Sequence, residues 1–292
     1  MTNILVTGAT GNIGRKTLQQ LLKRVPASDL IGLARDPDKA LDLAAAGIEI
    51  RQGDYADYDG LVRAFSGVDK LMLVSAPAFT DRNRGHANAI QAARDAGIKH
   101  IVYMPVIHKE GSDFVLPQVS AEDVFALEAI KASSLAYTIV SHPPFLENIE
   151  LYLGGMAHET GVQAPAGIGK AAYACRDDLA QAHAVVLTEP GHENKTYMLY
   201  GEQAVSFADV AQILSDISAK PVPFVTVSDQ DFMSRLTAAG LPAPAADFVL
   251  AWVHGINAGE WDGASGDLET LLGRKPVTVP EFLHATYPTR QA

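Results

Sequence analysis

Three glycines near the start of the chain have the spacing of a phosphate-binding loop. Gly8, Gly11 and Gly14 follow the strand-like run 3–7 and lie at the start of a helical pattern that begins at residue 12. Such a turn brings backbone N–H groups close to a pyrophosphate, whose charge the helix dipole also stabilises. The loop therefore predicts a bound dinucleotide. The loop residues expected to contact it are Gly8, Thr10, Gly11, Asn12 and Ile13.

The adenosine end of such a ligand would meet residues that follow the second, third and fourth expected strands. Arg35 stands where an NAD-selecting protein usually carries Asp or Glu, and its guanidinium suits the 2′-phosphate of NADPH. NADPH is therefore the expected cofactor and NADH the less favoured one, with a solvated surface arginine as the alternative reading of Arg35. Position alone indicates the other contacts, which are Asp54, Tyr55, Ser75, Ala76 and Pro77.

The nicotinamide end is expected where the fifth and sixth strands finish, because ligands of open α/β sheets bind at the carboxyl ends of the strands. Tyr103 finishes the fifth strand, and His142 follows the sixth, where it could donate a proton near neutral pH. These two are the candidate catalytic residues, although a lone histidine in a proline-rich turn is more often structural. The neighbouring cofactor contacts are expected to be Met104, Pro105, Pro143, Pro144 and Phe145.

Aromatic and polar side chains near these strand ends supply a candidate pocket for a second substrate. The expected pocket residues are Phe79, His108, Phe145 and Trp252. Phe248, Trp252 and His254 fall at near-helical spacing, which fits either a core stripe or a pocket wall. His108 and Lys109 would serve either as proton donors or as solvated loop residues. Cys175 is expected to be a small buried hydrophobe, and no His or Asp spacing indicates a metal site.

Alternating β-rich and helical runs must position these residues. Strands are expected at 3–7, 29–34, 48–52, 70–75, 99–104 and 136–141, with helices at 12–24, 37–46, 57–66, 82–96 and 121–133. This alternation predicts an α/β fold, a Rossmann-type doubly wound parallel sheet of six strands. Beyond about residue 150 the expected elements are helices near 176–187, 206–219, 228–239, 244–258 and 279–285, and strands at 195–200 and 222–227. We therefore expect two interleaved units, an NAD(P)-binding Rossmann domain over 1–150 and a smaller, mostly helical C-terminal substrate lid over 151–292.

Composition and charge exclude several classes of protein. The formal net charge of -11 and the pI near 5.2 argue against a nucleic-acid partner, because nucleic-acid binders gather Lys and Arg on one face. No apolar run reaches the ~18 to 20 residues that cross a bilayer, so no membrane partner is expected. A single cysteine and the lack of a signal-peptide pattern indicate a cytoplasmic protein. The oligomeric state is open, with a homodimer as one option.

Several motifs together resemble a known family. They are the glycine loop at 7–14, Gly53-Asp54, the run 92–103 and the strand 136–140. In these motifs the chain looks like the atypical short-chain dehydrogenase/reductases of the NmrA-like group. Residues 187–197 and 256–259 are similar to its NAD(P)H:quinone oxidoreductase and triphenylmethane reductase branch. The resemblance covers nearly the whole chain, and it implies a bound NAD(P)H and a small aromatic or quinonoid substrate.

The sequence departs from the larger superfamily at the residues that reduce carbonyls, which are a Tyr-x-x-x-Lys pair and a Ser. No Tyr has Lys four residues later, and the aligned Tyr, Lys and Ser positions hold Val119, Asp123 and Pro105. Ordinary alcohol dehydrogenation is therefore not expected. One remaining function is an NADPH-dependent reductase of a quinone, azo dye or triphenylmethane dye, which takes hydride without a strong acid. The other is a non-catalytic NAD(P)-binding redox sensor of the NmrA type.

Overall fold

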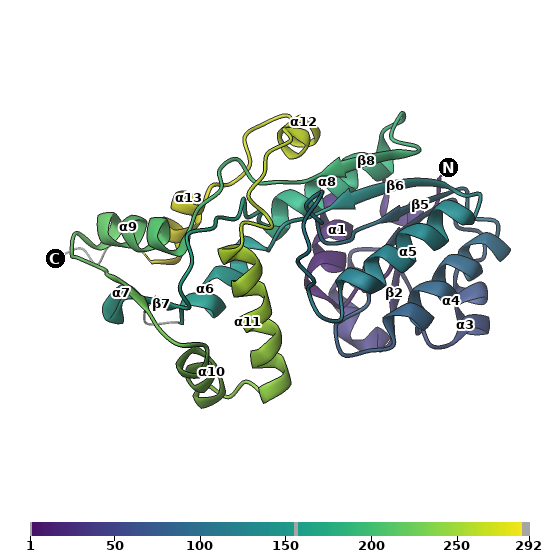
Figure 1. Cartoon of the computed structure of the whole chain (residues 1–292). Helices are drawn as coiled ribbons and strands as arrows, with labels where there is room; N and C mark the ends of the chain where they lie inside the picture. The colour runs from purple at the N-terminus through teal and green to yellow at the C-terminus, as the bar shows by residue number, and fades with distance from the viewer. Residues whose placement is uncertain (1, 155–156, 288–292) are drawn as a thin grey trace.

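A seven-stranded sheet forms the centre of the computed structural model, which describes residues 2–154 and 157–287 (Figure 1). Its strands are β1 (Ile4–Val6), β2 (Leu30–Ala34), β3 (Glu49–Gln52), β4 (Lys70–Leu73), β5 (His100–Tyr103), β6 (Ala136–Ser141) and β8 (Lys195–Met198). They lie in the order β3-β2-β1-β4-β5-β6-β8, and every neighbouring pair is parallel. The order reverses between β1 and β4, which is the switch point where open α/β sheets bind ligands.

Helices cover both faces of the sheet, because successive residues of a strand point to opposite sides. In β1, Ile4 and Val6 pack into one apolar cluster and Leu5 packs into another. The first face carries α1 (Asn12–Leu21), α2 (Leu41–Ala45), α8 (Arg176–Thr188) and α12 (Asp267–Leu272). The second face, at the front of Figure 1, carries α3 (Tyr58–Ala64), α4 (Arg82–Asp95) and α5 (Ser120–Ala132). The sheet is therefore doubly wound, as predicted.

The sheet has one strand more than the six expected from the sequence, so that expectation is wrong. The strand predicted at 195–200 is β8, which pairs with β6 (Thr138 beside Lys195) and extends the sheet instead of belonging to the lid. The helix predicted at 176–187 is α8, which packs against α1, and its residues 182–187 are all buried. The chain therefore leaves the sheet after β6, returns through α8 and β8, and leaves again.

Residues outside the sheet form a second, mostly helical unit with its own apolar core. Its helices are α6 (Ile149–Leu153), α7 (Ala157–Thr160), α9 (Phe207–Ser218), α10 (Asp229–Ala238), α11 (Ala243–Asn257) and α13 (Val279–Thr286). A two-stranded parallel sheet joins β7 (Val162–Ala164) to β9 (Phe224–Thr226). Ser206 and Asp209 exchange hydrogen bonds in a capping box at the start of α9.

The elements that the sequence did not predict are short. Helices α6, α7 and α12 have 5, 4 and 6 residues, and β7 has 3. Such lengths show too little of an apolar period to be recognised. Three 3-10 helices lie at Ala27–Asp29, Pro37–Ala40 and Leu146–Asn148. Residues 1 and 288–292, at the outer ends of the two predicted domain ranges, lie outside the described residues.

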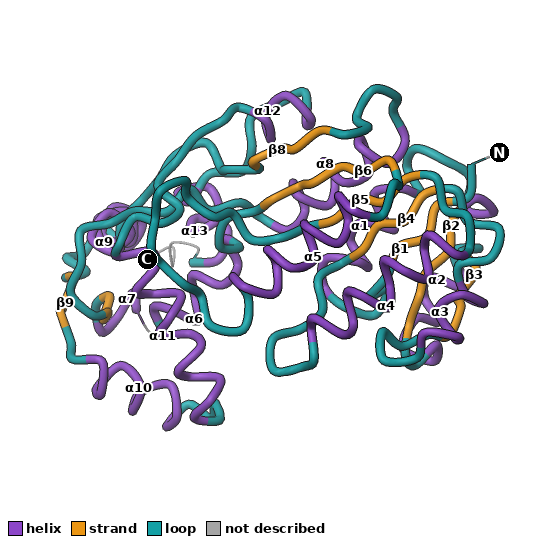
Figure 2. The backbone as a smooth tube through the Cα atoms, turned by 45° about the vertical axis from the view of Figure 1, so that its right-hand side comes forward, coloured by secondary structure: helices purple, strands orange, loops and turns teal. Residues whose placement is uncertain are grey.

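The second unit lies beside the sheet, and the loop after β5 contacts it (Figures 1 and 2). Trp261 Nε1 donates a hydrogen bond to Ile107 O at 3.0 Å. The buried carboxylate of Glu260 accepts one from Lys109 N at 2.9 Å. Because ligands bind at the carboxyl ends of parallel strands, a site there would lie between the sheet and the second unit.

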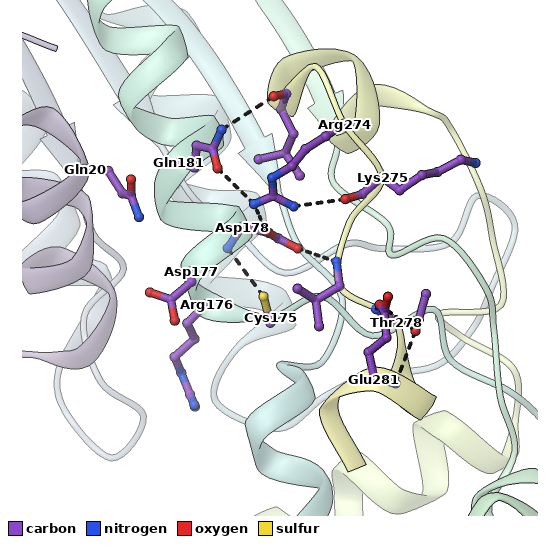
Figure 3. A network of polar contacts seen from close by, with 12 residues as sticks. Gln20, Cys175, Arg176, Asp177, Asp178, Gln181, Arg274, Lys275, Thr278 and Glu281 are labelled. Carbon is purple, nitrogen blue, oxygen red and sulfur yellow. Dashed lines mark hydrogen bonds and ion pairs between the residues drawn. The ribbon is translucent and has the colours of Figure 1, made fainter. Parts of the chain in front are cut away.

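A buried polar network also ties α8 to the segment between α12 and α13 (Figure 3). Asp178 is 1% exposed and accepts hydrogen bonds from Arg274 Nη2 at 2.6 Å and from Val277 N at 2.7 Å. Arg274 Nη2 also donates to Gln181 Oε1 at 3.0 Å. None of these four residues lines the cavity described below. The network therefore fixes the C-terminal segment without forming part of that cavity.

Candidate functional site

The phosphate loop joins the end of β1 to the start of α1. Gly8 has a φ of +64°, a conformation that a side chain would strain. A Cβ added to Gly14 would lie 2.4 Å from the carbonyl oxygen of Gly8, so only glycine lets α1 pack this closely on the loop. Gly11 is the N-cap of α1, and no side chain of the described residues caps the helix. The first N–H groups of α1 are therefore available to an anion.

A cavity of about 350 Å³ extends from this loop to the ends of β2, β3 and β4. Ten of the predicted cofactor residues line it, namely Gly8, Thr10, Gly11, Ile13, Arg35, Asp54, Tyr55, Ser75, Ala76 and Pro77. Asn12, which was also predicted, is exposed and does not line it. Several other lining residues were not predicted from the sequence, among them Leu33, Val74, Thr80, Asp81, Arg84 and Gly85. The residues at the start of α4 were predictable as part of the cavity lining, because a helix that follows the fourth strand must begin at the same sheet edge.

Arg35 follows β2 and lies at the protein surface. It lines the cavity and also an adjoining hollow of about 770 Å³, which it shares with Arg51 and Arg63. Arg51 is ion-paired with Glu49 at 2.8 Å. The guanidinium of Arg35, in contrast, has no ion-pair partner in the described part of the chain. An unpaired guanidinium at this strand end suits the 2′-phosphate that the sequence predicted for it.

The two predicted cofactor residues that follow β3 differ in their surroundings. Asp54 is exposed, and its Oδ1 accepts a hydrogen bond from Ala56 N at 2.9 Å, which stabilises the turn after β3. The Tyr55 hydroxyl instead points into the protein, where it bonds Thr7 Oγ1 at 2.6 Å and Val74 O at 2.7 Å. Burial of that hydroxyl raises the pKa of Tyr55. Tyr55 therefore ties the end of β3 to β1 and β4 from the side of the cavity.

The loops after β5 and β6 run side by side. His142 N donates to Pro105 O at 3.0 Å, and Ile107 N donates to His142 O at 2.9 Å. This pairing brings four predicted contacts to one sheet edge, outside the 350 Å³ cavity: Met104, Pro105, Pro143 and Pro144. Phe145 follows them, and the guanidinium of Arg176 lies 4.5 Å from its ring centroid. The structure therefore divides the predicted cofactor residues between the cavity and these paired loops.

Both candidate catalytic side chains are buried. Tyr103 is 0% exposed, and its hydroxyl donates to Asp123 Oδ1 at 2.8 Å. His142 is 2% exposed, and burial, with a further contribution from His183, lowers the pKa of His142 well below its usual value. A neutral imidazole does not carry the extra proton that a general acid gives up. Neither side chain lines the cavity, and the catalytic roles expected for Tyr103 and His142 stay predictions.

A buried ion pair includes Asp123, the residue that the sequence predicted to stand at the lysine position of the larger superfamily. Asp123 in α5 is 0% exposed and accepts a hydrogen bond from Arg82 Nη2 at 2.6 Å. Val119, in the aligned Tyr position, is the buried N-cap residue of the same helix. Burial raises the pKa of Asp123, and the Arg82 guanidinium opposes that rise. Arg82 carried no signal in the sequence, because an arginine in the first turn of a helix is ordinarily solvated.

Aromatic rings form a row between the loop after β4 and the second unit. Phe79 packs edge to face on Phe248 of α11, with ring centroids 5.6 Å apart. Phe248 meets Trp252 at 6.2 Å, and Trp252 stacks on Trp261 at 4.8 Å. Phe79 is 50% exposed, while Phe248 and Trp252 are half-buried. Of the three residues predicted at near-helical spacing, Phe248 and Trp252 therefore form part of this aromatic row. The third, His254, is exposed.

The remaining pocket candidates have other contacts. Phe145 makes its ring contacts with His142 and Arg176. His108 is half-buried in the loop after β5, and its Nε2 has no hydrogen-bond partner among the described residues. The neighbouring Lys109 donates from Nζ to Gly259 O at 3.0 Å, which fixes this loop to the second unit.

Cys175 is buried, as expected, and burial raises the pKa of its thiol to about 12. The described residues contain no group of three His, Cys, Asp or Glu side chains that could hold a metal ion. Among the same residues, no helix combines the length and apolar character needed to span a membrane.

The parallel sheet, the glycine loop at the start of α1 and the cavity across the switch point define a dinucleotide-binding Rossmann protein. The chain belongs to the NAD(P)H-binding family, whose model matches residues 8–190. This membership confirms the fold class predicted from the sequence.

Relatives match along nearly the whole chain. Quinone oxidoreductase 2 of Escherichia coli (strain K12) is 37% identical over 279 residues, which cover 95% of this chain and 96% of that protein. The NAD(P)H azoreductase of Xenophilus azovorans is 32% identical and covers 97% of each chain. The crystal structure of Citrobacter sp. triphenylmethane reductase complexed with NADP(H) is 36% identical, with a TM-score of 0.90 over 97% of this chain and 99% of that chain. The resemblance to the quinone oxidoreductase and triphenylmethane reductase branch is thereby confirmed.

Proposed function

We propose that this protein is an NADPH-dependent reductase that transfers hydride to a quinone or another conjugated aromatic acceptor, such as an azo or triphenylmethane dye. The observation that carries the proposal is a dinucleotide cavity that adjoins a partly exposed aromatic row. Phe79, in that row, lies between Pro77 and Thr80, which both line the cavity. The relatives named quinone oxidoreductase 2 and NAD(P)H azoreductase support the same class of acceptor.

The residues of the site fit a dinucleotide. The glycine loop leaves room that a Cβ at Gly14 would fill, and the uncapped start of α1 would hold the pyrophosphate. Arg35 would bind the 2′-phosphate. Residues 75–77 and the paired loops after β5 and β6 would hold the nicotinamide riboside. When bound there, NADPH supplies the hydride that the acceptor takes.

The aromatic row would hold the acceptor. Phe79, Phe248 and Trp252 present ring surface on which a flat conjugated molecule can stack, and stacking also excludes water. Proximity and orientation would then supply most of the rate acceleration. A reduced quinone is a phenolate whose pKa is roughly 10, close to that of tyrosine, so water can protonate it. Such an acceptor needs no acidic side chain, which agrees with the burial of Tyr103 and His142.

The test is the oxidation of NADPH, measured as the loss of reduced-nicotinamide absorbance, with quinones, azo dyes, triphenylmethane dyes and simple aldehydes. We expect turnover with the conjugated acceptors and little with the aldehydes. The Gly14→Ala variant should lose NADPH binding because its Cβ meets the Gly8 carbonyl, whereas Gln19→Ala, on the exposed side of the same helix, should not. NADPH binding without turnover of any acceptor would contradict the reductase and favour the redox sensor.

Three predictions from the sequence stay predictions. They are a cytoplasmic location, a homodimer, and the division into a Rossmann domain over 1–150 and a lid over 151–292.

A further inference from the structure

The Arg82–Asp123 pair is the most deeply buried ion pair at the carboxyl edge of the sheet. Arg82, in the first turn of α4, is 5% exposed, and Asp123, in the first turn of α5, is 0% exposed. Removing both charges from water costs about as much as their attraction returns, so such a pair is weak evidence for a role in stability. The hydrogen bonds that the two side chains make to other groups therefore indicate their role better than the ion pair itself.

The carboxylate of Asp123 is occupied by donors from three parts of the chain. Its Oδ1 accepts hydrogen bonds from Arg82 Nη2 at 2.6 Å and from the Tyr103 hydroxyl at 2.8 Å. Its Oδ2 accepts one from Val106 N at 2.9 Å. Arg82 extends the network in the other direction, because its Nη1 donates to the carbonyl oxygen of Ala76. One ion pair thus fixes backbone atoms of the loops after β4 and after β5.

The network reaches the wall of the cavity. The Ser75 hydroxyl lies 3.2 Å from the Tyr103 hydroxyl and 2.9 Å from Met104 O, to which it donates. Ala76 N donates to His86 Nε2 at 3.0 Å. Ser75 and Ala76 both line the dinucleotide cavity. The positions of Ser75 and Ala76 are therefore fixed by hydrogen bonds to residues that do not line the cavity.

We infer that Arg82 and Asp123 are positioning residues, which hold residues 75–76 and 104–106 at the spacing required by the nicotinamide riboside. The inference rests on the proposed function, which places that end of NADPH at the ends of β4 and β5. The two residues contact the backbone of the site and not the reacting atoms. The aligned lysine of the larger superfamily is thereby replaced by a buried carboxylate that orders the site instead of taking part in proton transfer.

The experiment compares two ligands that differ at the nicotinamide end. NADPH carries the nicotinamide riboside, whereas adenosine 2′,5′-bisphosphate carries only the adenosine and the 2′-phosphate. Calorimetry with the Asp123→Asn variant should show NADPH affinity reduced about 10-fold or more, because binding must then re-order residues 75–76 and 104–106, and each ~1.4 kcal/mol of such cost is about tenfold in affinity. The affinity for the bisphosphate should change less than about twofold, because its part of the cavity does not depend on the pair.

Asp178→Asn is the matched control. Asp178 is also a buried aspartate that accepts from an arginine at 2.6 Å and from a backbone N–H, but it lies outside the cavity (Figure 3). We expect it to leave both affinities unchanged. Arg82→Lys, which keeps the charge but loses the fork that joins Ala76 and Asp123, should reduce NADPH affinity less than Asp123→Asn does.

If Asp123→Asn does not fold, the double variant Arg82→Gln/Asp123→Asn, which leaves no unpaired buried charge, provides the same two affinities. Equal losses for NADPH and the bisphosphate, or no loss for either, would overturn the inference. Because both readouts are binding constants, they do not depend on turnover. A wild-type protein that binds NADPH but reduces no acceptor would therefore refute the proposed function and leave this comparison intact.

Discussion

Replacing Arg35 with Ala should weaken the binding of NADPH and leave the binding of NADH nearly unchanged. A hydrogen bond to a charged group contributes ~1.5 to 3 kcal/mol, and each 1.4 kcal/mol is about tenfold in affinity. Arg35 lies at the protein surface, where solvent screens its charge, so the lower part of this range applies. No ion pair has to be broken before the guanidinium meets a phosphate. We therefore expect a loss of about 10-fold to 30-fold for NADPH.

The assay is calorimetric titration with each cofactor at one ionic strength. Arg63→Ala is a suitable control, because it removes the same charge from the same hollow. Arg63 is ion-paired with Asp57 at 3.9 Å, whereas Arg35 has no ion-pair partner in the described part of the chain. Equal losses for NADPH and NADH in the Arg35 variant would refute the assignment of the 2′-phosphate. So would an equal loss of NADPH affinity in the Arg63 variant.

Four further predictions follow from the buried groups and the aromatic row. His142→Ala should lower quinone turnover by less than the ~100-fold expected for loss of a general acid. Phe79→Ala should instead raise the KM for flat acceptors. Steady-state kinetics with NADPH in excess measures both effects. Burial lowers the pKa of His183 to about 3, below the unfolded value near 6.5, so the unfolded state binds the extra proton and the free energy of unfolding falls as the pH decreases below 6.5. Urea titrations should show about 2 kcal/mol of this loss per buried neutral histidine at pH 5, and His183→Leu should remove one such share. Asp178→Asn should lower the free energy of unfolding by about 1 to 3 kcal/mol. This loss is smaller than that expected for a fully buried ion pair, because Arg274 is half-exposed. An unchanged urea midpoint would contradict this prediction.

The elements around the phosphate loop were predictable because their signals are local. Gly8, Gly11 and Gly14 lie within one turn, and the β-rich run before them is directly followed by the helix. Residues that follow strands, such as Arg35 and Ser75, could be assigned to the same edge, since all strands of a parallel sheet end there. The structure places these residues along one cavity.

The seventh strand could not be assigned from the sequence because its partner is distant. Lys195 pairs with Thr138, and an edge strand of 4 residues has the same pattern in a lid as in a sheet. The sequence of α8 does carry a sign of its burial. Residues 182–187 comprise three large apolar side chains, two alanines and one histidine, with no charged residue on any side of the helix, which is typical of a helix covered on several faces.

The candidate catalytic residues show a different limit of sequence reasoning. Position at a strand end indicates the correct edge but not the direction of the side chain, and both Tyr103 and His142 are directed into the protein. The sequence singled out Asp123 only for its aligned position and gave no sign of Arg82, because the two residues lie 41 residues apart and only their contact identifies them as a pair. A charged residue alone in a helix gives no indication of such a partner.

The most direct test of the central claim is hydride transfer from NADPH that carries deuterium at C4 of the nicotinamide. With a triphenylmethane dye, whose central carbon accepts the hydride, the account predicts that the label appears on the product. With a quinone it predicts a primary isotope effect on the single-turnover rate. Tight binding of the labelled NADPH with no transfer to any conjugated acceptor would contradict the account.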